Sequence, residues 1–161
     1  MFFKRKKKNE AIEVKAYFEG TALPLEQVKD PMFADKVMGD GAAIEPSDGS
    51  LYAPVDGTVA TIFDTKHAIG FTLENGAEVL MHIGMDTVEL QGEGFDLDIS
   101  VGDKVKAGQF MGKIDIDFIK SKGKEVTTPV LLTTMDDYKI EFVKTDGPVN
   151  IGDVLYKISR K

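Results

Sequence analysis

The chain contains only two histidines, His67 and His82, and they flank a segment with the pattern of a β-hairpin. Asn75-Gly76 separates two strand-like runs, and this dipeptide is a strong hairpin signal because both turn positions require positive φ. If Asn75-Gly76 forms a two-residue loop, Ile69 faces His82, and His67 faces Gly84. The two histidines are then diagonal neighbours on one face of the sheet, about 7–8 Å apart at Cα.

Two imidazoles at that separation can hold one tetrahedral anion between them, which indicates histidine chemistry on phosphate. A histidine nucleophile needs one free ring nitrogen, while the other donates to an acceptor such as a backbone carbonyl. Gly84 follows His82 by two residues and lets the backbone curl back to supply that carbonyl. The inference depends on register, since a slip of one residue sends the rings to opposite faces. The alternative is that both histidines are ordinary core residues.

The surroundings of the pair also suit reversible transfer of a phosphoryl group. Ile69, Phe71 and Leu80 are expected on the same face, where they would exclude water, although any buried sheet face has this composition. Arg160 is the only arginine after residue 10, so the folded part cannot build an arginine cage around a phosphate. A weakly stabilised phosphohistidine releases its phosphoryl group again.

Length and composition favour one intracellular domain. With 161 residues, 42% of them hydrophobic, the chain is long enough for a single well-buried core. It has no cysteine, which excludes disulfides, thiolate metal sites and a cysteine nucleophile. No apolar run approaches the roughly 18 residues of a membrane span, and Met1 is not followed by the apolar segment of a secretory signal. We therefore expect a cytoplasmic protein.

Charge is distributed unevenly along the chain. Five of the 20 basic residues lie at positions 4–8, so the remaining 153 residues carry 15 basic and 27 acidic groups, a balance of −12. Such a body is unsuited to nucleic acid and suited to a basic protein partner. We expect a basic, disordered tail over residues 1–10 and a single domain over residues 11–161. Two phenylalanines and the basic cluster in residues 1–8 suit weak contact with an anionic membrane surface, the alternative being a solubilising end.

Turn signals such as Asp56-Gly57 recur between β-branched and aromatic runs. They predict an all-β fold, an antiparallel β-sandwich of short strands with one or two short helical turns. One helix is expected with Asp30 as its cap, Pro31 at its first position and Gly39 as its stop. An apolar-Gly-Asp turn occurs at residues 101–103 and again at 151–153, which indicates either duplicated half-motifs or ordinary hairpin chemistry.

The segment from His82 to Leu90, with Gly92-Glu93-Gly94-Phe95 after it, resembles the active-site signature of the glucose-type enzyme IIA of the bacterial sugar phosphotransferase system. Residues 53–68, 32–41 and 128–130 resemble further motifs of that family in the same order. The similarity extends from about residue 20 to the C-terminus.

The resemblance implies an antiparallel β-sandwich that carries phosphate, with no cofactor and no metal. It makes His82 the acceptor, through Nε2, of a phosphoryl group from the carrier protein HPr, which then passes to a cysteine of the IIB domain of a sugar permease. His67 would hydrogen-bond the phosphoryl group, Thr65 would orient the pair, and the Gly84 carbonyl would accept from Nδ1–H of His82. The resemblance also implies an apolar docking ring with Asp86 at its rim, formed by Met32, Phe33, Val37, Phe63, Phe71 and Leu80.

Three other functions were weighed. A zinc peptidase site typically needs three protein ligands, and the chain has two histidines in the wrong spacing. A lipoyl or biotinyl carrier shares blocks similar to residues 53–57 and 101–109, but residues 114–118 lack the expected lysine motif. A regulatory binding protein, with partners switched by phosphorylation, would use the same acidic and apolar face, and the sugar is not specified by this chain.

Overall fold

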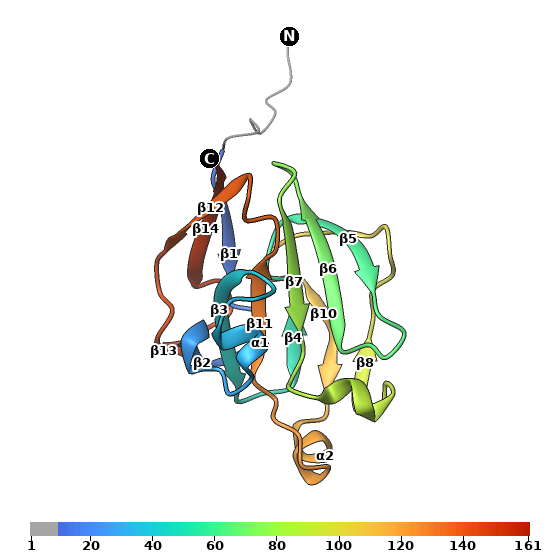
Figure 1. Ribbon diagram of the computed structural model, residues 1–161. Coiled ribbons are helices and arrows are strands. Elements are labelled where there is room, and N and C mark those ends of the chain that lie inside the picture. Colours follow the sequence, from blue (N-terminus) through green and yellow to red (C-terminus); the bar gives the residue numbers. More distant parts are fainter. Residues whose placement is uncertain (1–9) are drawn as a thin grey trace.

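The computed structural model describes residues 10–161, and these form short strands with a few helical turns (Figure 1). The strands are β1 Ile12–Lys15, β2 Gly20–Pro24, β3 Asp40–Pro46, β4 Ser50–Tyr52, β5 Gly57–Ile62, β6 Ala68–Leu73, β7 Glu78–His82, β8 Phe95–Leu97, β9 Lys104–Val105, β10 Phe110–Ile114, β11 Thr128–Leu132, β12 Tyr138–Phe142, β13 Gly147–Val149 and β14 Val154–Arg160. The helices are α1 Pro31–Ala34 and α2 Ile116–Ser121, with 3₁₀ turns η1 Leu25–Gln27 and η2 Thr87–Leu90. The predicted all-β fold class is confirmed.

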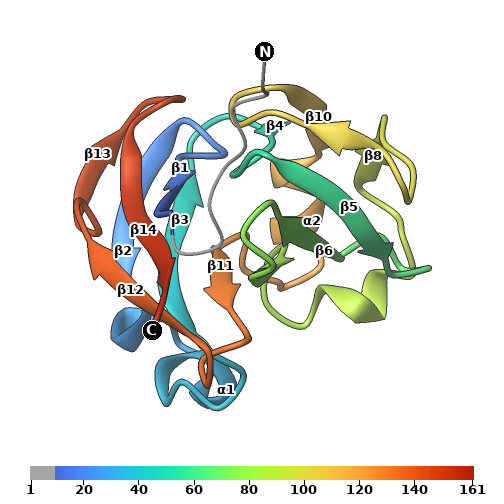
Figure 2. The same ribbon diagram turned by 90° about the horizontal axis from the view of Figure 1, so that it is seen from above.

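Every strand pairing between these elements is antiparallel. The described strands form an eight-stranded sheet in the order β13-β2-β3-β11-β7-β6-β5-β9 and two three-stranded sheets, β4-β10-β8 and β1-β14-β12. Seen from above, β12, β13 and β14 lie on one side and β5, β8 and β10 on the other, with β11 between them (Figure 2). Strand β11 pairs with β3 and β7 and is buried at all five positions, so it anchors the middle of the large sheet.

Alternation along β6 and β7 sorts their side chains between core and surface. Ile69, Phe71 and Leu73 of β6 are buried in the main apolar cluster, as are Val79 and Met81 of β7. Successive side chains of a strand point to opposite faces. The residues between them, which include Leu80 and His82, therefore belong to the outer face of the sheet.

Helix α1 is shorter than the sequence predicts. Asp30 caps it as expected, because its carboxylate accepts from the Met32 N–H at 2.9 Å. The helix ends at Ala34, and Lys36 adopts a left-handed conformation with φ of 59°. The predicted stop at Gly39 is wrong: a Cβ at Gly39 would lie 2.2 Å from the Leu132 carbonyl oxygen, so glycine is required there for close contact with β11.

The two apolar-Gly-Asp turns are equivalent in structure. In each, the aspartate side chain, Asp103 or Asp153, accepts at 2.8 Å from the backbone N–H three residues earlier. In each, the aspartate carbonyl also accepts at 2.8 Å, from the N–H of Val59 in one case and of Ala16 in the other. Agreement in both bonds favours duplicated half-motifs over unrelated hairpins.

The predicted basic tail over residues 1–10 lies, apart from Glu10, outside the described residues. Within residues 10–161, no helix combines the length and the apolar character needed to cross a bilayer.

Candidate functional site

The β6–β7 hairpin positions the two histidines, but its register differs from the prediction by one residue. Ala68 lies opposite His82, where the two-residue loop predicted Ile69. The loop contains three residues, 74–76, because the N–H of Leu73 donates to the carbonyl of Ala77, the first residue after the loop. The predicted two-residue loop is therefore wrong.

The side chain of Asn75 explains the different turn. Only Gly76 has a positive φ, of 90°, in this loop. Asn75 is buried, its amide donates to the carbonyls of Glu10 and Ile158 at 3.2 and 3.3 Å, and its oxygen accepts from the Ala77 N–H at 3.1 Å. Asn75 thus connects the hairpin to the β1–β14 edge, a tertiary role that the Asn-Gly pattern does not reveal.

The two rings are nevertheless adjacent. His67 precedes β6 and follows Lys66, which has a left-handed φ of 61°. Within a regular strand in this register, His67 would point to the face opposite His82. Because His67 lies before β6, its side chain is not bound by that alternation. The ring centroids of His67 and His82 are 5.0 Å apart and the rings are nearly perpendicular, at 82°. The predicted proximity is observed, although its predicted geometric basis is wrong.

Hydrogen bonds at Nδ1 define the state of the His82 ring. Nδ1 lies 2.8 Å from the carbonyl oxygen of Gly84. A carbonyl only accepts, so the neutral ring carries its proton on Nδ1 and leaves a lone pair on Nε2. Nδ1 of His67 lies 2.6 Å from the hydroxyl of Thr65, which can donate or accept. Both partners, Gly84 and Thr65, are those that the resemblance implied.

Burial keeps both imidazoles neutral at pH 7. It is the main cause that lowers the pKa of His82, while the Gly84 carbonyl and the charges of Asp30 and Asp86 oppose it. The pKa of His67 is lowered first by burial and then by repulsion from the His82 ring when both rings are protonated. Since an ordinary histidine has a pKa of about 6.5, the lowered values leave the lone pair on Nε2 of His82 available as a nucleophile.

Comparison with known proteins bears on what this histidine pair does. The sequence profile of the family described as "phosphoenolpyruvate-dependent sugar phosphotransferase system, EIIA 1" matches residues 12–138. The chain belongs to this family. The "glucose permease IIA from Mycoplasma capricolum" has a similar structure, with a TM-score of 0.87 and 35% identity over 95% of this chain and 99% of that one.

Two longer relatives of this EIIA chain are similar in sequence. The "PTS system glucose-specific EIICBA component" of Streptococcus pneumoniae is 49% identical over 146 residues, which are 91% of this chain and 20% of the relative. The "PTS system beta-glucoside-specific EIIBCA component" of Bacillus subtilis is 46% identical over 141 residues, 88% of this chain and 23% of the relative. The EIIA chain thus spans about a fifth of the length of these curated relatives.

Aromatic rings line the histidine pair of the EIIA domain. The ring of Phe33, buried in α1, lies 4.9 Å from that of His82 between centroids. The ring of Phe63, which is 44% exposed, lies 5.5 Å from that of His67 in an edge-on arrangement. His82 is therefore packed against a buried ring, and His67 against a partly exposed one.

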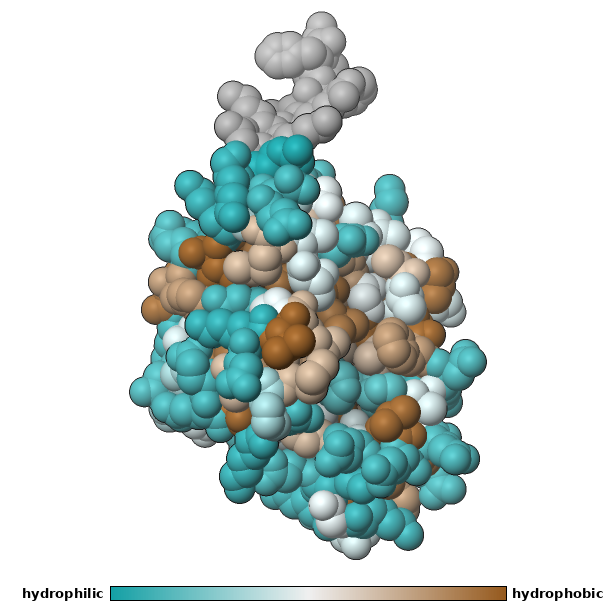
Figure 3. Space-filling view, viewed as in Figure 1, coloured by the Kyte–Doolittle hydropathy of each residue, from teal (hydrophilic) through white to brown (hydrophobic). Residues whose placement is uncertain are grey.

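Four large apolar side chains are exposed on the elements that flank the pair, and we call them the apolar rim: Met32, Val37, Phe63 and Val88. Leu80, on the outer face of β7, is half-buried. Figure 3 shows apolar side chains in the middle of the face that carries α1, β6 and β7, with hydrophilic residues around them. Val88 was missed from the sequence, although it lies within the signature after His82, because the short turn η2 that exposes it was not predicted.

Phe71 is a correction to the predicted docking ring. It faces Val79 across the hairpin and is only 1% exposed, in the main core cluster. Ile69 is likewise in the core, so neither residue shares the outer face with His82 as expected. The cause is the one-residue shift in register, which inverts the predicted facing of β6.

Two carboxylates stand close enough to His82 to act on its charge. Asp86 adopts a left-handed φ of 58° at the start of η2, where its side chain makes no capping bond. Asp30, which the sequence marked only as the cap of α1, acts on His82 in the same direction as Asp86, toward a higher pKa. The effect of Asp30 depends on where α1 lies in the fold, and no local pattern signals it.

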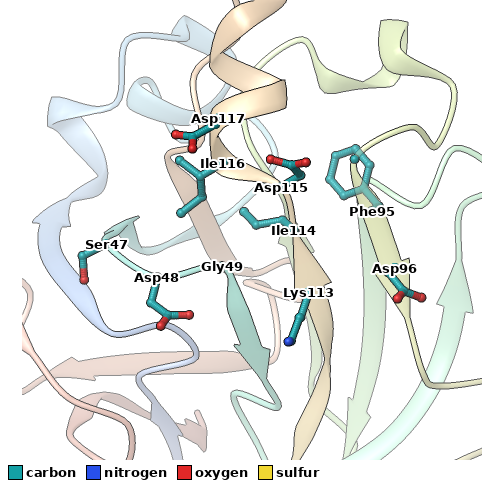
Figure 4. A pocket seen from close by; sticks show the side chains of 11 residues that line it. Ser47, Asp48, Gly49, Phe95, Asp96, Lys113, Ile114, Asp115, Ile116 and Asp117 are labelled. Atoms are coloured by element: carbon teal, nitrogen blue, oxygen red, sulfur yellow. The ribbon is translucent and has the colours of Figure 1, made fainter.

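A cavity of about 700 Å³ is separate from the histidine site (Figure 4). Its side chains come from the β3–β4 loop, β8, β10 and the start of α2, and neither histidine is among them. The Asp48 and Asp115 carboxylates accept from the N–H groups of Ser50 and Phe118, so both have structural roles. Within the part of the chain that the structure describes, no three His, Cys, Asp or Glu side chains group to hold a metal ion.

Proposed function

We propose that this EIIA domain carries a phosphoryl group on Nε2 of His82 between two cytoplasmic partners. The group comes from the phosphohistidine of HPr and passes to a cysteine of the IIB domain of a sugar permease. The observation that carries the proposal is the 2.8 Å contact between Nδ1 of His82 and the Gly84 carbonyl, which directs the lone pair to Nε2. As the N–P bond of HPr breaks, a new N–P bond forms at Nε2, and the proton of His82 stays on Nδ1.

His67 is proposed to hold the phosphoryl oxygens. If the Thr65 hydroxyl donates to Nδ1 of His67, the ring proton lies on Nε2, from which it can donate to a phosphoryl oxygen. Arg160, the only arginine of the described residues, donates to the Tyr138 hydroxyl at 3.0 Å and is engaged there. A neutral donor stabilises a phosphohistidine less than a guanidinium would, which suits a carrier that must release its load.

The apolar rim, with Phe33 behind it and Leu80 and Asp86 beside it, is proposed as the docking surface for both partners. Apolar residues at the centre and charges at the edge are typical of protein interfaces. The acidic body would attract a basic HPr before contact. A phosphoryl group on His82 adds nearly two negative charges at the middle of this surface, so regulatory partners that bind there would respond to phosphorylation.

The relatives do not agree on one sugar, since one is described as glucose-specific and the other as beta-glucoside-specific. We therefore propose that the permease selects the sugar and that the EIIA domain carries phosphate for either class.

The test is incubation with labelled phosphoenolpyruvate, enzyme I and HPr, followed by mapping of acid-labile phosphate. We expect the label on His82 and none on the folded His82→Ala variant. His67→Gln keeps a hydrogen-bond donor but cannot take up a proton, so His82 should still be labelled while transfer to the IIB domain slows. Label on His67, or label retained by His82→Ala, would contradict the proposal.

A further inference from the structure

The backbone on either side of Gly84 is fixed at all four of its polar groups. In the peptide before Gly84, the Ile83 carbonyl accepts from the Thr87 hydroxyl at 2.5 Å, and the Gly84 N–H donates to the Thr128 hydroxyl at 3.3 Å. In the peptide after it, the Gly84 carbonyl accepts from His82, and the Met85 N–H donates to the Glu125 carbonyl at 2.9 Å. Both peptide planes are therefore held against rotation.

Thr87 lies against Gly84 as well as bonding to the peptide before it. It is fully buried in η2, and a Cβ built on Gly84 would lie 2.6 Å from its γ-methyl carbon. Gly84 has a φ of 75°, in the left-handed region. The Thr87 methyl therefore packs against the glycine that supplies the carbonyl, and its hydroxyl holds the preceding peptide.

Thr128 reaches Gly84 from the central strand β11. It is fully buried, and its hydroxyl donates to the Val126 carbonyl at 2.8 Å while accepting from Gly84. Its own carbonyl accepts from the Tyr17 hydroxyl at 2.5 Å. Thr128 is thus held by hydrogen bonds to two buried residues, Val126 and Tyr17, which makes it a rigid support for a loop residue.

We propose that Thr87 and Thr128 are positioning residues that keep the His82 proton on Nδ1 by aiming the Gly84 carbonyl at it. Neither threonine touches the reacting atoms, and both act through the backbone of Gly84. If the carbonyl turns away, Nδ1–H loses its acceptor and the proton can occupy Nε2, the atom that must attack. The consequence for phosphoryl transfer rests on the proposed function, whereas the position of the proton does not.

The test compares threonine variants that differ in the hydroxyl alone. Thr87→Val and Thr128→Val keep the branched shape and remove the hydroxyl, whereas Thr87→Ser and Thr128→Ser keep the hydroxyl and remove the methyl. Ring ¹⁵N chemical shifts of His82, measured by NMR above its pKa, report which nitrogen carries the proton. We expect each valine variant to raise the ratio of Nε2–H to Nδ1–H about tenfold, the effect of one lost hydrogen bond, and each serine variant to resemble the wild type.

The same proteins are then assayed for the rate of phosphorylation by HPr. The rate should fall in the valine variants in proportion to the Nδ1-protonated fraction of His82 that the NMR shows to be lost, and it should not fall in the serine variants. Folding is checked from backbone NMR spectra, and Thr87→Ala and Thr128→Ala replace any valine variant that does not fold. An unchanged His82 proton position in folded variants without the hydroxyl would overturn the inference, whatever their rates. A shifted proton in a set where even the wild type takes no phosphate from HPr would support the positioning role and overturn the proposed function.

Discussion

Replacing Gly84 by alanine should destabilise the fold in two ways, through backbone strain and through steric contact. The structure allows these two contributions to be separated. An alanine with a φ of 75° would be in the left-handed region, which costs about 1–2 kcal/mol for a residue with a Cβ. That Cβ would also lie 2.6 Å from both the Glu125 carbonyl oxygen and the Thr87 methyl. Relieving such contacts in a packed site costs a further 1–3 kcal/mol, roughly. We therefore expect Gly84→Ala to lower the free energy of unfolding by about 2–5 kcal/mol.

Gly123 provides a matched control. Its φ of 77° is almost that of Gly84, but a Cβ there would meet nothing within 4 Å. Gly123→Ala should lose only the backbone contribution, about 1–2 kcal/mol. Urea unfolding of the three proteins, with slopes compared to exclude changes in the unfolded state, gives the difference. Equal losses in the two variants would refute the claim that Glu125 and Thr87 confine Gly84.

Three further predictions concern pH, the hairpin and the tail. Folding lowers the pKa of both histidines, so the unfolded chain takes up protons first as the pH falls below about 6.5. Urea unfolding should therefore show a stability that is constant above that pH with respect to these groups and that decreases below it. The decrease should be smaller in His67→Gln, and an unchanged dependence of stability on pH in that variant would contradict the assignment. Asn75→Ala should cost about 1–3 kcal/mol in urea unfolding, because it removes the amide that donates to the carbonyls of Glu10 and Ile158, the second of these bonds being buried. Exposed Asn150→Ala should change stability by less than about 0.5 kcal/mol, and similar losses in the two variants would argue against these contacts. If residues 1–8 contact membranes, the protein should sediment with anionic vesicles at low salt, less so at moderate salt, and not at all once these residues are deleted. Binding that survives the deletion, or no binding at low salt, rules out the membrane hypothesis.

The fold class was predictable because turn chemistry is local. Asp103 and Asp153 each form a turn with the backbone N–H three residues earlier, and such bonds depend only on a few adjacent residues. The cap of α1 is local as well, and Asp30 serves as predicted. The end of that helix is not, since Gly39 is required by the approach of Leu132, a residue distant in the sequence.

For the histidine pair, the local turn rule predicted the correct proximity from an incorrect strand register. The Asn-Gly signal predicted two turn residues. The buried side chain of Asn75 instead bonds to the carbonyl of Glu10, just before β1, and to that of Ile158 in β14, and the turn has three residues. That shift moved Phe71 from the predicted docking face into the core. His67 still meets His82, because it lies before the strand and is exempt from alternation. Register is a tertiary property, and sequence patterns near a turn constrain it only partly.

Under the proposed function His82 must give its phosphoryl group away, and the charges around the ring fit that requirement. Asp30 and Asp86 favour positive charge on the His82 ring, and the same field opposes a negative phosphoryl group on Nε2. The rim is apolar and the ring is partly desolvated, so this repulsion is weakly screened until a partner arrives. Under the proposed function, a basic partner would reduce this repulsion as it docks. The two aspartates would thereby make phosphorylated His82 less stable in the free domain than in a complex with a basic partner.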